Sequence, residues 1–218
     1  MKATCVGLIV MVTLLLSGCV TGDEITYYIV DPDGTVAFSI YRLNLTSDEK
    51  GENAKKDLTN YVRGLEENRD SLLLKLAKAN AGEVSVKILR RTSPASVLIT
   101  GRIPSLNDFA AYASETGKQD SIICTSVSRE RTRGIRCELI RKPSKEEARS
   151  EPAKSLADSF SQMRIALAEG GFTKAQGFII SNDRRSALLD MDLLSKLWEN
   201  LDVRSIILSL EWQVPEAE

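Results

Sequence analysis

The stretch SIICTSVSRERTRGIRCELI, residues 121–140, contains two runs of alternating apolar and polar side chains, separated by the charged segment RERT. Such alternation predicts two antiparallel strands with one face turned toward a core. If RERT forms a four-residue loop, Ser128 pairs with Arg133, and the same register places Cys124 opposite Cys137. Facing residues at a non-hydrogen-bonded position lie close enough for a cross-strand bridge. We therefore predict a disulfide between the two cysteines; the alternative is two buried free thiols.

The same hairpin carries the strongest local positive charge of the chain. Basic side chains clearly outnumber acidic ones between residues 129 and 142, and the candidate anion-binding residues are Arg129, Arg131, Arg133 and Arg136. In a chain of net charge −1, this cluster predicts binding to an anionic partner, such as phospholipid head groups, lipopolysaccharide or an acidic protein face. The alternative is a solvated rim that discourages edge-to-edge pairing of strands.

Strand-like and helix-like segments alternate on both sides of this hairpin. Further strands are predicted at 25–30, 35–43, 83–90, 95–102, 172–181 and 203–212, and helices at 52–80, 105–113, 152–169 and 184–201. Strand pairs that alternate with helices favour an α+β fold with mainly antiparallel sheets, built from ββα units whose helices pack on one face. Residues 35–128 also follow the βαββαβ order of ferredoxin-like folds.

Two short motifs favour local structure over chemistry. The DPDG sequence at 31–34 has the proline and glycine of a tight turn, and the residues after it supply none of the further oxygen ligands that a calcium loop needs. Ser47 and Lys50 match the S-x-x-K pattern of serine acyl enzymes, but the partner motifs S-D-N and K-T-G are absent. We interpret the first motif as a turn and the second as a solvated loop.

The N-terminus has the three parts of an export signal. These are a positive charge at Lys2, an apolar run at 6–16 and the small residues Ser17 and Gly18. The apolar run is too short to cross a bilayer, which takes roughly 20 apolar residues. We therefore predict a signal peptide at 1–18.

The four residues around the end of this signal carry a family resemblance. Leu16-Ser17-Gly18-Cys19 resembles the lipobox of bacterial lipoprotein precursors. The resemblance implies cleavage before Cys19, acylation of this cysteine and a lipid anchor in a membrane. Because Val20 stands where an aspartate would favour the inner membrane, the resemblance also implies the outer membrane, facing the periplasm, if the host has one. The alternative is an ordinary signal peptide with an incidental cysteine.

Cleavage at this position divides the chain into three parts. We predict the signal peptide at 1–18, a short lipid-anchored tether at 19–24, and an α+β domain at 25–218 with a candidate sub-boundary in the loop-like segment 141–152. Five extended residues between the anchor and the first strand reach about 17 Å, so we expect the domain to lie close to the bilayer. Export to an oxidising compartment also permits the disulfide.

Several chemistries are excluded. The chain has no histidine, which removes Ser-His-Asp and Cys-His catalysis and every histidine-dependent metal site. Glycine-rich phosphate loops are absent, and we expect neither a cofactor nor a metal. Asp190 and Asp192 are an acidic pair, but at i and i+2 of a predicted helix they do not share a face. A slightly acidic, exported chain also argues against nucleic acid as a partner.

Two functions from different classes remain. We expect a membrane-anchored, non-catalytic lipoprotein that binds or helps to assemble another component of the cell envelope. The alternative is an envelope hydrolase or carbohydrate-active enzyme that uses carboxylates. A deep cleft with two inward acidic side chains would favour the enzyme.

Overall fold

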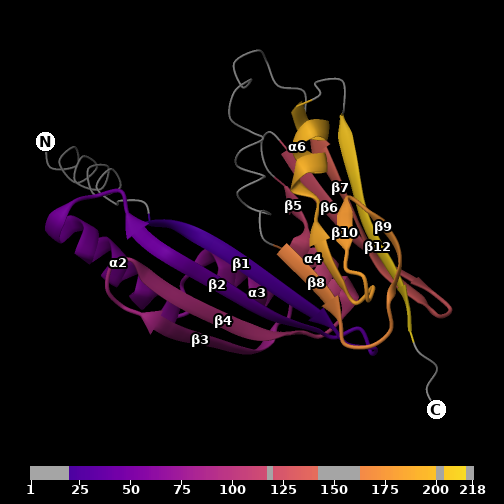
Figure 1. The fold of residues 1–218 in the computed structure, drawn as a ribbon. Helices are drawn as coiled ribbons and strands as arrows, with labels where there is room; N and C mark the ends of the chain where they lie inside the picture. The colour runs from indigo at the N-terminus through magenta and orange to yellow at the C-terminus, as the bar shows by residue number, and fades with distance from the viewer. Residues whose placement is uncertain (1–19, 117–119, 142–162, 200–203, 215–218) are drawn as a thin grey trace, which may run out of the picture. The chain divides into compact units, whose positions relative to one another are not determined.

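The computed structural model describes residues 20–116, 120–141, 163–199 and 204–214 (Figure 1). It has an α+β fold with two mainly antiparallel sheets, which confirms the predicted class. The 7-stranded sheet, sheet A, has the strand order β10-β11-β8-β1-β2-β4-β3. The 5-stranded sheet, sheet B, has the order β5-β6-β7-β12-β9.

The strands and helices have the following bounds. Sheet A consists of β1 (Val20–Val30), β2 (Val36–Ser47), β3 (Gly82–Arg90), β4 (Ala95–Ile103), β8 (Met163–Leu167), β10 (Phe178–Ile180) and β11 (Ser186–Leu189). Sheet B consists of β5 (Glu115–Thr116), β6 (Asp120–Arg129), β7 (Thr132–Arg141), β9 (Phe172–Gln176) and β12 (Ser205–Gln213). The helices are α2 (Gly51–Glu66), α3 (Ser71–Lys78), α4 (Leu106–Ala113) and α6 (Met191–Glu199).

The chain divides into two units. Of the described residues, unit 1 contains 20–23, 41–70 and 86–98, and unit 2 contains the remainder. In unit 1, α2 buries Leu58, Val62 and Leu65. The i, i+4, i+7 spacing of these residues places them on one face of the helix, as its apolar periodicity predicts.

The single helix predicted at 52–80 is wrong, because the chain forms α2 and α3 with a break between them. Asn68 has a left-handed backbone with φ of 55°. The backbone N–H groups of Asn68 and Arg69 donate to the carbonyl oxygens of Leu65 and Gly64, at 3.2 and 2.8 Å. This is a Schellman motif, in which asparagine takes the conformation usually left to glycine. An asparagine within an apolar helical pattern therefore ended the helix.

In unit 2, the C-terminal end of α3 is hydrogen-bonded to the N-terminal end of α4. α3 ends on Asn80, again with a φ of 55°, and not at the predicted stop Gly82, which begins β3. The Asn80 side-chain amide donates to the Asp108 carboxylate of α4 at 2.9 Å. Asp108 in turn donates its backbone N–H to the Ser105 hydroxyl at 3.1 Å, so the predicted capping residue is confirmed.

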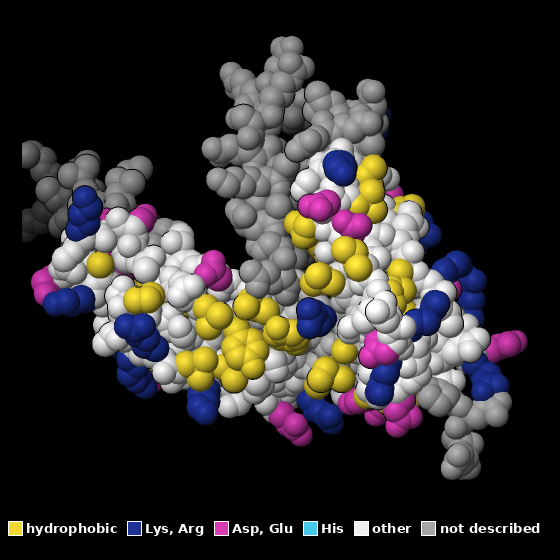
Figure 2. Space-filling model, viewed as in Figure 1, with side chains coloured by type: hydrophobic (Ala, Val, Ile, Leu, Met, Phe, Trp, Pro, Cys, Tyr) yellow, Lys and Arg dark blue, Asp and Glu magenta, His cyan; other side chains and the backbone are white. Residues whose placement is uncertain are grey.

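The core of unit 2 lies on the inner face of sheet A. Tyr28 and Val30 of β1 and Ile165 of β8 are buried. The Tyr28 ring packs against Phe109 of α4, with ring centroids 4.8 Å apart. The intervening residues of β1, Tyr27 and Ile29, are exposed. Figure 2 shows hydrophobic side chains gathered over the strands of sheet A on the face that it views.

Three predictions in the C-terminal part are wrong. The described end of the helix predicted at 152–169 is β8, which pairs in parallel with β1. Met163 and Leu167 are four residues apart, and this spacing fits one face of a strand as well as one face of a helix. The helix predicted at 184–201 is wrong in its first part, which forms β11 with Ala187 and Leu189 buried alternately, while 191–199 form the helix α6 as predicted.

The third wrong prediction is the single strand at 172–181. It consists of β9 in sheet B and β10 in sheet A. Gly177 lies between them with a φ of 75°, and a Cβ atom there would collide with Leu208. Glycine therefore permits the chain to change sheets at this point. The ferredoxin-like order of residues 35–128 also does not close within one sheet, because β6 belongs to sheet B while β2, β4 and β3 belong to sheet A.

Candidate functional site

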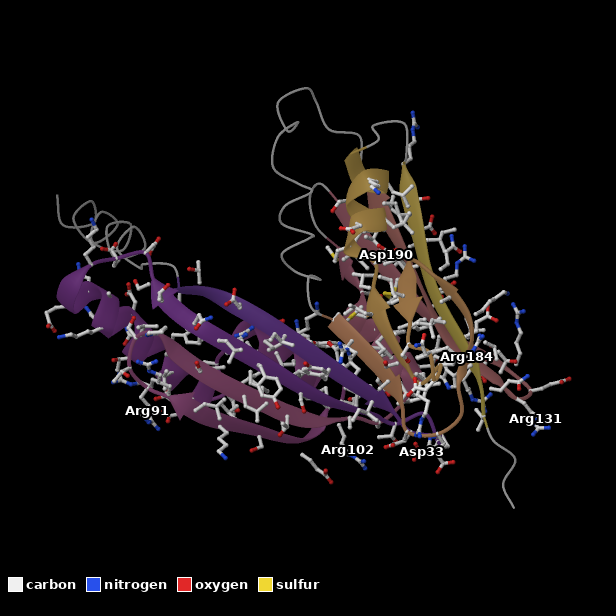
Figure 3. The ribbon with its side chains drawn as sticks, viewed as in Figure 1. Asp33, Arg91, Arg102, Arg131, Arg184 and Asp190 are labelled. Atoms are coloured by element: carbon white, nitrogen blue, oxygen red, sulfur yellow. A yellow bond between two sulfur atoms is a disulfide. The ribbon has the colours of Figure 1, made fainter. Side chains whose placement is uncertain are left out.

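The β6–β7 hairpin has the predicted register. Ser128 lies opposite Arg133, and Cys124 lies opposite Cys137. The pairing extends one step further than predicted, so the connection is a two-residue turn with Glu130 at a φ of 41°. Figure 3 shows the labelled Arg131 at the tip of this hairpin. The hairpin is therefore longer and its turn tighter than the sequence indicated.

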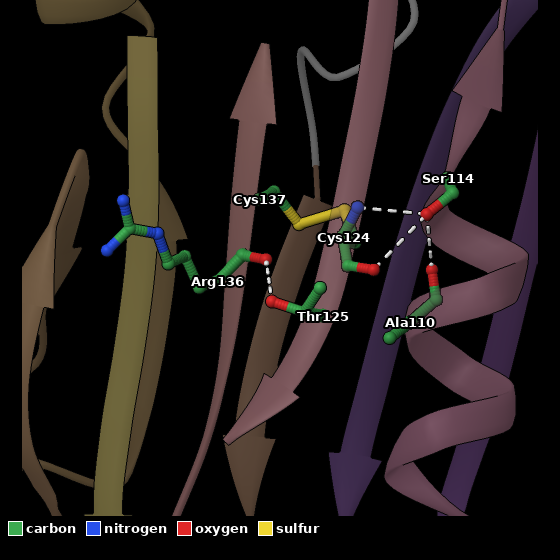
Figure 4. The surroundings of a disulfide bond; sticks show 6 residues. All are labelled: Ala110, Ser114, Cys124, Thr125, Arg136 and Cys137. Atoms are coloured by element: carbon green, nitrogen blue, oxygen red, sulfur yellow. Dashed lines mark hydrogen bonds between the residues drawn. A yellow bond between two sulfur atoms is a disulfide. The ribbon is translucent and has the colours of Figure 1, made fainter.

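The predicted disulfide between Cys124 and Cys137 is present (Figure 4). The Cα atoms of the two cysteines are 4.0 Å apart. The Cys124 backbone N–H donates to the Ser114 hydroxyl at 2.9 Å, and its carbonyl accepts from that hydroxyl at 3.4 Å. Because both backbone groups point away from β7, the bridge occupies a non-hydrogen-bonded pair. Ser114 also donates to the Ala110 carbonyl at 2.9 Å, which joins α4 to this edge of β6.

The register divides the four candidate arginines between different parts of the hairpin. Arg129 and Arg136 lie on the face of sheet B opposite the disulfide, and both are exposed. Arg131 is exposed in the turn. Arg133 is half-buried on the disulfide face, where its guanidinium donates to a carbonyl oxygen of the turn at 3.2 Å. The outward-facing part of the predicted cluster is therefore Arg129, Arg131 and Arg136.

A pocket of about 340 Å³ lies between α6 and β12. Its wall is mainly apolar and includes Leu193, Leu194, Leu197, Ile206, Ile207 and Leu208. Among the described lining residues, Asp190, labelled in Figure 3, is the one carboxylate. It accepts the backbone N–H of Leu193 at 2.9 Å. Asp190 therefore caps α6, and the pocket suits an apolar group better than acid–base chemistry.

The sequence did not predict the pocket, because the segment before α6 lies within the helix predicted at 184–201. Asp190 follows β11 directly and stands immediately before α6. Aspartate at this position is a helix N-cap signal, and it could have indicated the change from strand to helix. Asp192, the other member of the predicted acidic pair, is exposed and does not line the pocket.

Three aspartates have a pKa below the ordinary value of 3.8, and each serves a turn or a cap. They are Asp33, Asp108 and Asp183. The Thr35 backbone N–H, which donates to Asp33 at 2.8 Å, is the main cause of the lowered pKa of Asp33. The Ser181 hydroxyl does the same for Asp183 at 2.5 Å. A carboxyl group that is held ionised in this way is a poor general acid.

The motifs interpreted as local structure also serve turns. In DPDG, the Gly34 N–H donates to the Asp31 carbonyl at 2.9 Å, which confirms the turn. The Ser47 hydroxyl donates to Asp57 at 2.8 Å and accepts the Glu49 backbone N–H at 3.1 Å. Ser47 is thus bound to its own turn and to α2, as a structural serine would be.

The N-terminal strand begins earlier than predicted. β1 starts at Val20, so residues 20–24 of the predicted tether belong to sheet A. The Asn44 amide of β2 donates to the Asp23 carboxylate at 2.8 Å. Cys19, the predicted lipidation site, lies outside the described residues, as does the segment 142–152 of the predicted sub-boundary.

The described residues contain no group of three or more histidine, cysteine, aspartate or glutamate side chains arranged to hold a metal ion. None of the helices in the described part of the chain has the length and apolar character needed to cross a bilayer.

Comparison with known proteins gives one distant likeness. No family model matches the chain, and no curated protein matches it. Among solved structures, the chain is similar to the folded domain of the Mycobacterium tuberculosis LppM protein, determined by NMR. The two share 9% sequence identity with a TM-score of 0.41, over 90% of this chain and 93% of that one. Both values are low, so no statement about family or function follows from the likeness.

Proposed function

We propose that this chain is a lipid-anchored module of the cell envelope that binds, or helps to assemble, another envelope component without catalysing a reaction. The observation that carries the proposal is the start of β1. This strand begins at Val20, directly after the cysteine of the lipobox-like sequence Leu16-Ser17-Gly18-Cys19. Cleavage before Cys19 would leave the acylated residue joined directly to β1 of sheet A.

The disulfide supports export. Cys124 and Cys137 are bonded within a regular hairpin. Disulfides of this structural kind persist in oxidising compartments and are rare in the cytosol. A lipid anchor and a structural disulfide are consistent with the same location on the outer side of the cytoplasmic membrane.

The exposed arginines support the binding role, and the carboxylates of the pocket and turns weaken the enzyme alternative. Arg129, Arg131 and Arg136 present positive charge to solvent on a hairpin held by the disulfide. An anionic lipid head group or an acidic protein surface would complement them. The carboxylate-dependent enzyme has less support, since Asp190 is engaged as a helix cap and the aspartates of lowered pKa are engaged in their own turns and caps.

The anchor is tested by mass spectrometry of the N-terminal peptide from the membrane fraction. We expect the mature chain to begin at Cys19 with acyl chains attached. Cys19→Ala should abolish the modification and shift the protein away from the processed, membrane-bound form. Cys5→Ala is the matched control, because Cys5 lies within the signal and its loss should change neither result. An unmodified Cys19 in the wild-type protein would refute the anchor.

The binding role is tested by crosslinking in intact cells. We expect the lipidated protein to recover an envelope component in stoichiometric amount, and the double variant Arg129→Ser/Arg136→Ser to lose most of it. Lys55→Ser/Lys56→Ser removes the same charge from exposed positions of α2 and should retain the partner. Recovery of the protein alone, or equal loss in both double variants, would argue against binding through the hairpin.

A further inference from the structure

The outer face of sheet A carries a row of exposed apolar side chains, which we call the apolar band. It consists of Tyr27 and Ile29 on β1, Leu188 on β11 and Ile179 on β10, whose exposed fractions are 38%, 46%, 36% and 55%. The strand register aligns them. Ile179 is opposite Leu188, Leu188 is opposite Arg164, and Arg164 is opposite Tyr27. The band therefore has apolar members on β1, β11 and β10, with Arg164 of β8 between Tyr27 and Leu188.

The band is distinct from the core. Tyr28, Ile165 and Ala187 alternate with Tyr27, Arg164 and Leu188 along the same strands, and all three are buried on the inner face. Antiparallel sheets commonly bury one apolar face and expose a polar face to water, so the inner core does not require apolar side chains on the outer face. Scattered apolar residues are common on protein surfaces, whereas a cluster of them on one face of a sheet is a feature of interaction sites.

Arg164 and Tyr27 have the arrangement expected at a lipid interface. The Arg164 guanidinium lies over the Tyr27 ring, 5.8 Å from its centroid. Tyrosine rings, and long basic side chains whose stems lie on apolar surface, are typical of the boundary between acyl chains and head groups. Arg164 can reach a phosphate from this position while Tyr27 and its apolar neighbours contact the acyl region.

We propose that the apolar band rests on the lipid bilayer that holds the Cys19 anchor. This inference depends on the proposed function, because the anchor supplies proximity. Tyr27 lies seven positions after Val20 on the same strand. At about 3.3 Å per residue, the chain between them spans about 23 Å at most. Tethering over such a distance gives millimolar effective concentrations, so a modest apolar surface is sufficient for stable contact.

A labelling experiment on the lipidated protein tests the contact. The variant Leu188→Cys carries an environment-sensitive fluorophore on the band. The matched control Ile123→Cys carries it on the outer face of sheet B, where Ile123 is 49% exposed. Cys124 and Cys137 form a disulfide, so labelling is specific for the introduced cysteine in protein whose Cys19 carries the proposed acyl chains. Both proteins are reconstituted into phosphatidylethanolamine–phosphatidylglycerol vesicles, with and without lipids that carry a spin-label quencher on the acyl chain.

We expect blue-shifted emission and quenching by the spin-labelled lipid at position 188, and water-like, unquenched emission at position 123. Ile179→Cys should repeat the result of Leu188→Cys, which guards against a local disturbance of β11. Water-like emission at both band positions would overturn the proposal. A blue shift without quenching would also overturn it, since a protein surface would then cover the band. Equal quenching at 123 would show non-specific adsorption and would count against it.

The lipid anchor and the membrane contact of the apolar band can be refuted independently. The mass of the N-terminal peptide from the same preparation reports the lipid on Cys19 directly. If Cys19 is unmodified, the proposed function fails. The band is then decided alone by the same labels on the Cys5→Ala/Cys19→Ala chain added to vesicles, because its other two cysteines are disulfide-bonded. Quenching at 188 in that sample would retain lipid contact, and its absence would reject it.

Discussion

The outer faces of the two sheets expose different kinds of side chain. Sheet A presents the apolar band. The corresponding face of sheet B presents Arg129 and Arg136, together with Lys174, whose ammonium group lies 3.5 Å from the Glu211 carboxylate. Both sheets bury their other face, so one-sided burial alone does not determine the character of the exposed side. The two proposals above assign these surfaces of unit 2 separate uses, one for lipid and one for a charged partner.

The two sheets also differ in how their strands are held together. β6 and β7 are adjacent in sequence and are joined by the disulfide. β1 and β8 are far apart in sequence and pair in parallel, with Tyr28 opposite Ile165. Sheet A therefore depends on packing of its inner face, whereas the central hairpin of sheet B has a covalent constraint.

The largest effect is expected from a matched pair of truncations on opposite faces of sheet A. Ile165→Ala, at a side chain only 3% exposed, should lower the free energy of unfolding by about 2–5 kcal/mol, because it removes buried methyl groups and leaves a cavity. Ile29→Ala, at a side chain 46% exposed, should change it by less than about 0.5 kcal/mol. Chemical denaturation of the unlipidated chain measures both.

This comparison can fail in an informative way. If Ile29→Ala costs as much as Ile165→Ala, the outer face of sheet A is covered in solution. A dependence of that cost on protein concentration would then identify a second copy of the chain as the cover. The apolar band would in that case be an interface between copies, and the contrast between the two sheets would disappear.

The next effect concerns sheet B. The double variant Cys124→Ser/Cys137→Ser should lose about 3 kcal/mol of stability, because the bond closes a short loop in the unfolded chain. Reduction of the wild-type protein with dithiothreitol should produce the same loss, and the double variant should not respond to the reductant. An unfolding midpoint that is unchanged by reduction would mean that the bond does not constrain the unfolded chain.

The hairpin was predictable because the information that determines it is local. The alternation around 121–140 and the positions of the two cysteines determine one register, and a one-residue shift would turn every side chain to the wrong face. The same register could also have sorted the arginines. Arg133 is an even number of residues from Cys137 and shares its face, whereas Arg136 is adjacent to Cys137 and lies on the other face.

The C-terminal half was harder to predict because its determinants are not local. β8 forms a strand by pairing with β1, and nothing in the sequence near Met163 and Leu167 distinguishes a strand face from a helix face. The change of sheet at Gly177 depends on the close approach of Leu208, which is distant in sequence. The pocket beside α6 is lined by Gly177 and Leu208. It could not be predicted from a sequence pattern that indicates one continuous helix before it.

The smallest predicted effect concerns α4, which contacts both sheets through Phe109 and Ser114. The Ser105 hydroxyl and then the Asn80 amide hold the pKa of Asp108 below 3.8. A lowered pKa in the folded state adds stability that is fully present above the unfolded pKa and is lost as the pH falls through the folded one. Stability should therefore decline more steeply below about pH 4 in the wild type than in Asp108→Asn.

The cap itself gives a second measure of the same contact. Ser105→Ala should cost about 1 kcal/mol at neutral pH, because it removes the acceptor for the Asp108 N–H. Asp192→Asn is the control for loss of one exposed carboxylate in a first helical turn. Denaturation curves at several pH values distinguish the variants. Equal acid sensitivity of Asp108→Asn and the wild type would show that the cap does not couple α4 to pH, and the two sheets would then lose stability in acid for reasons unrelated to the helix between them.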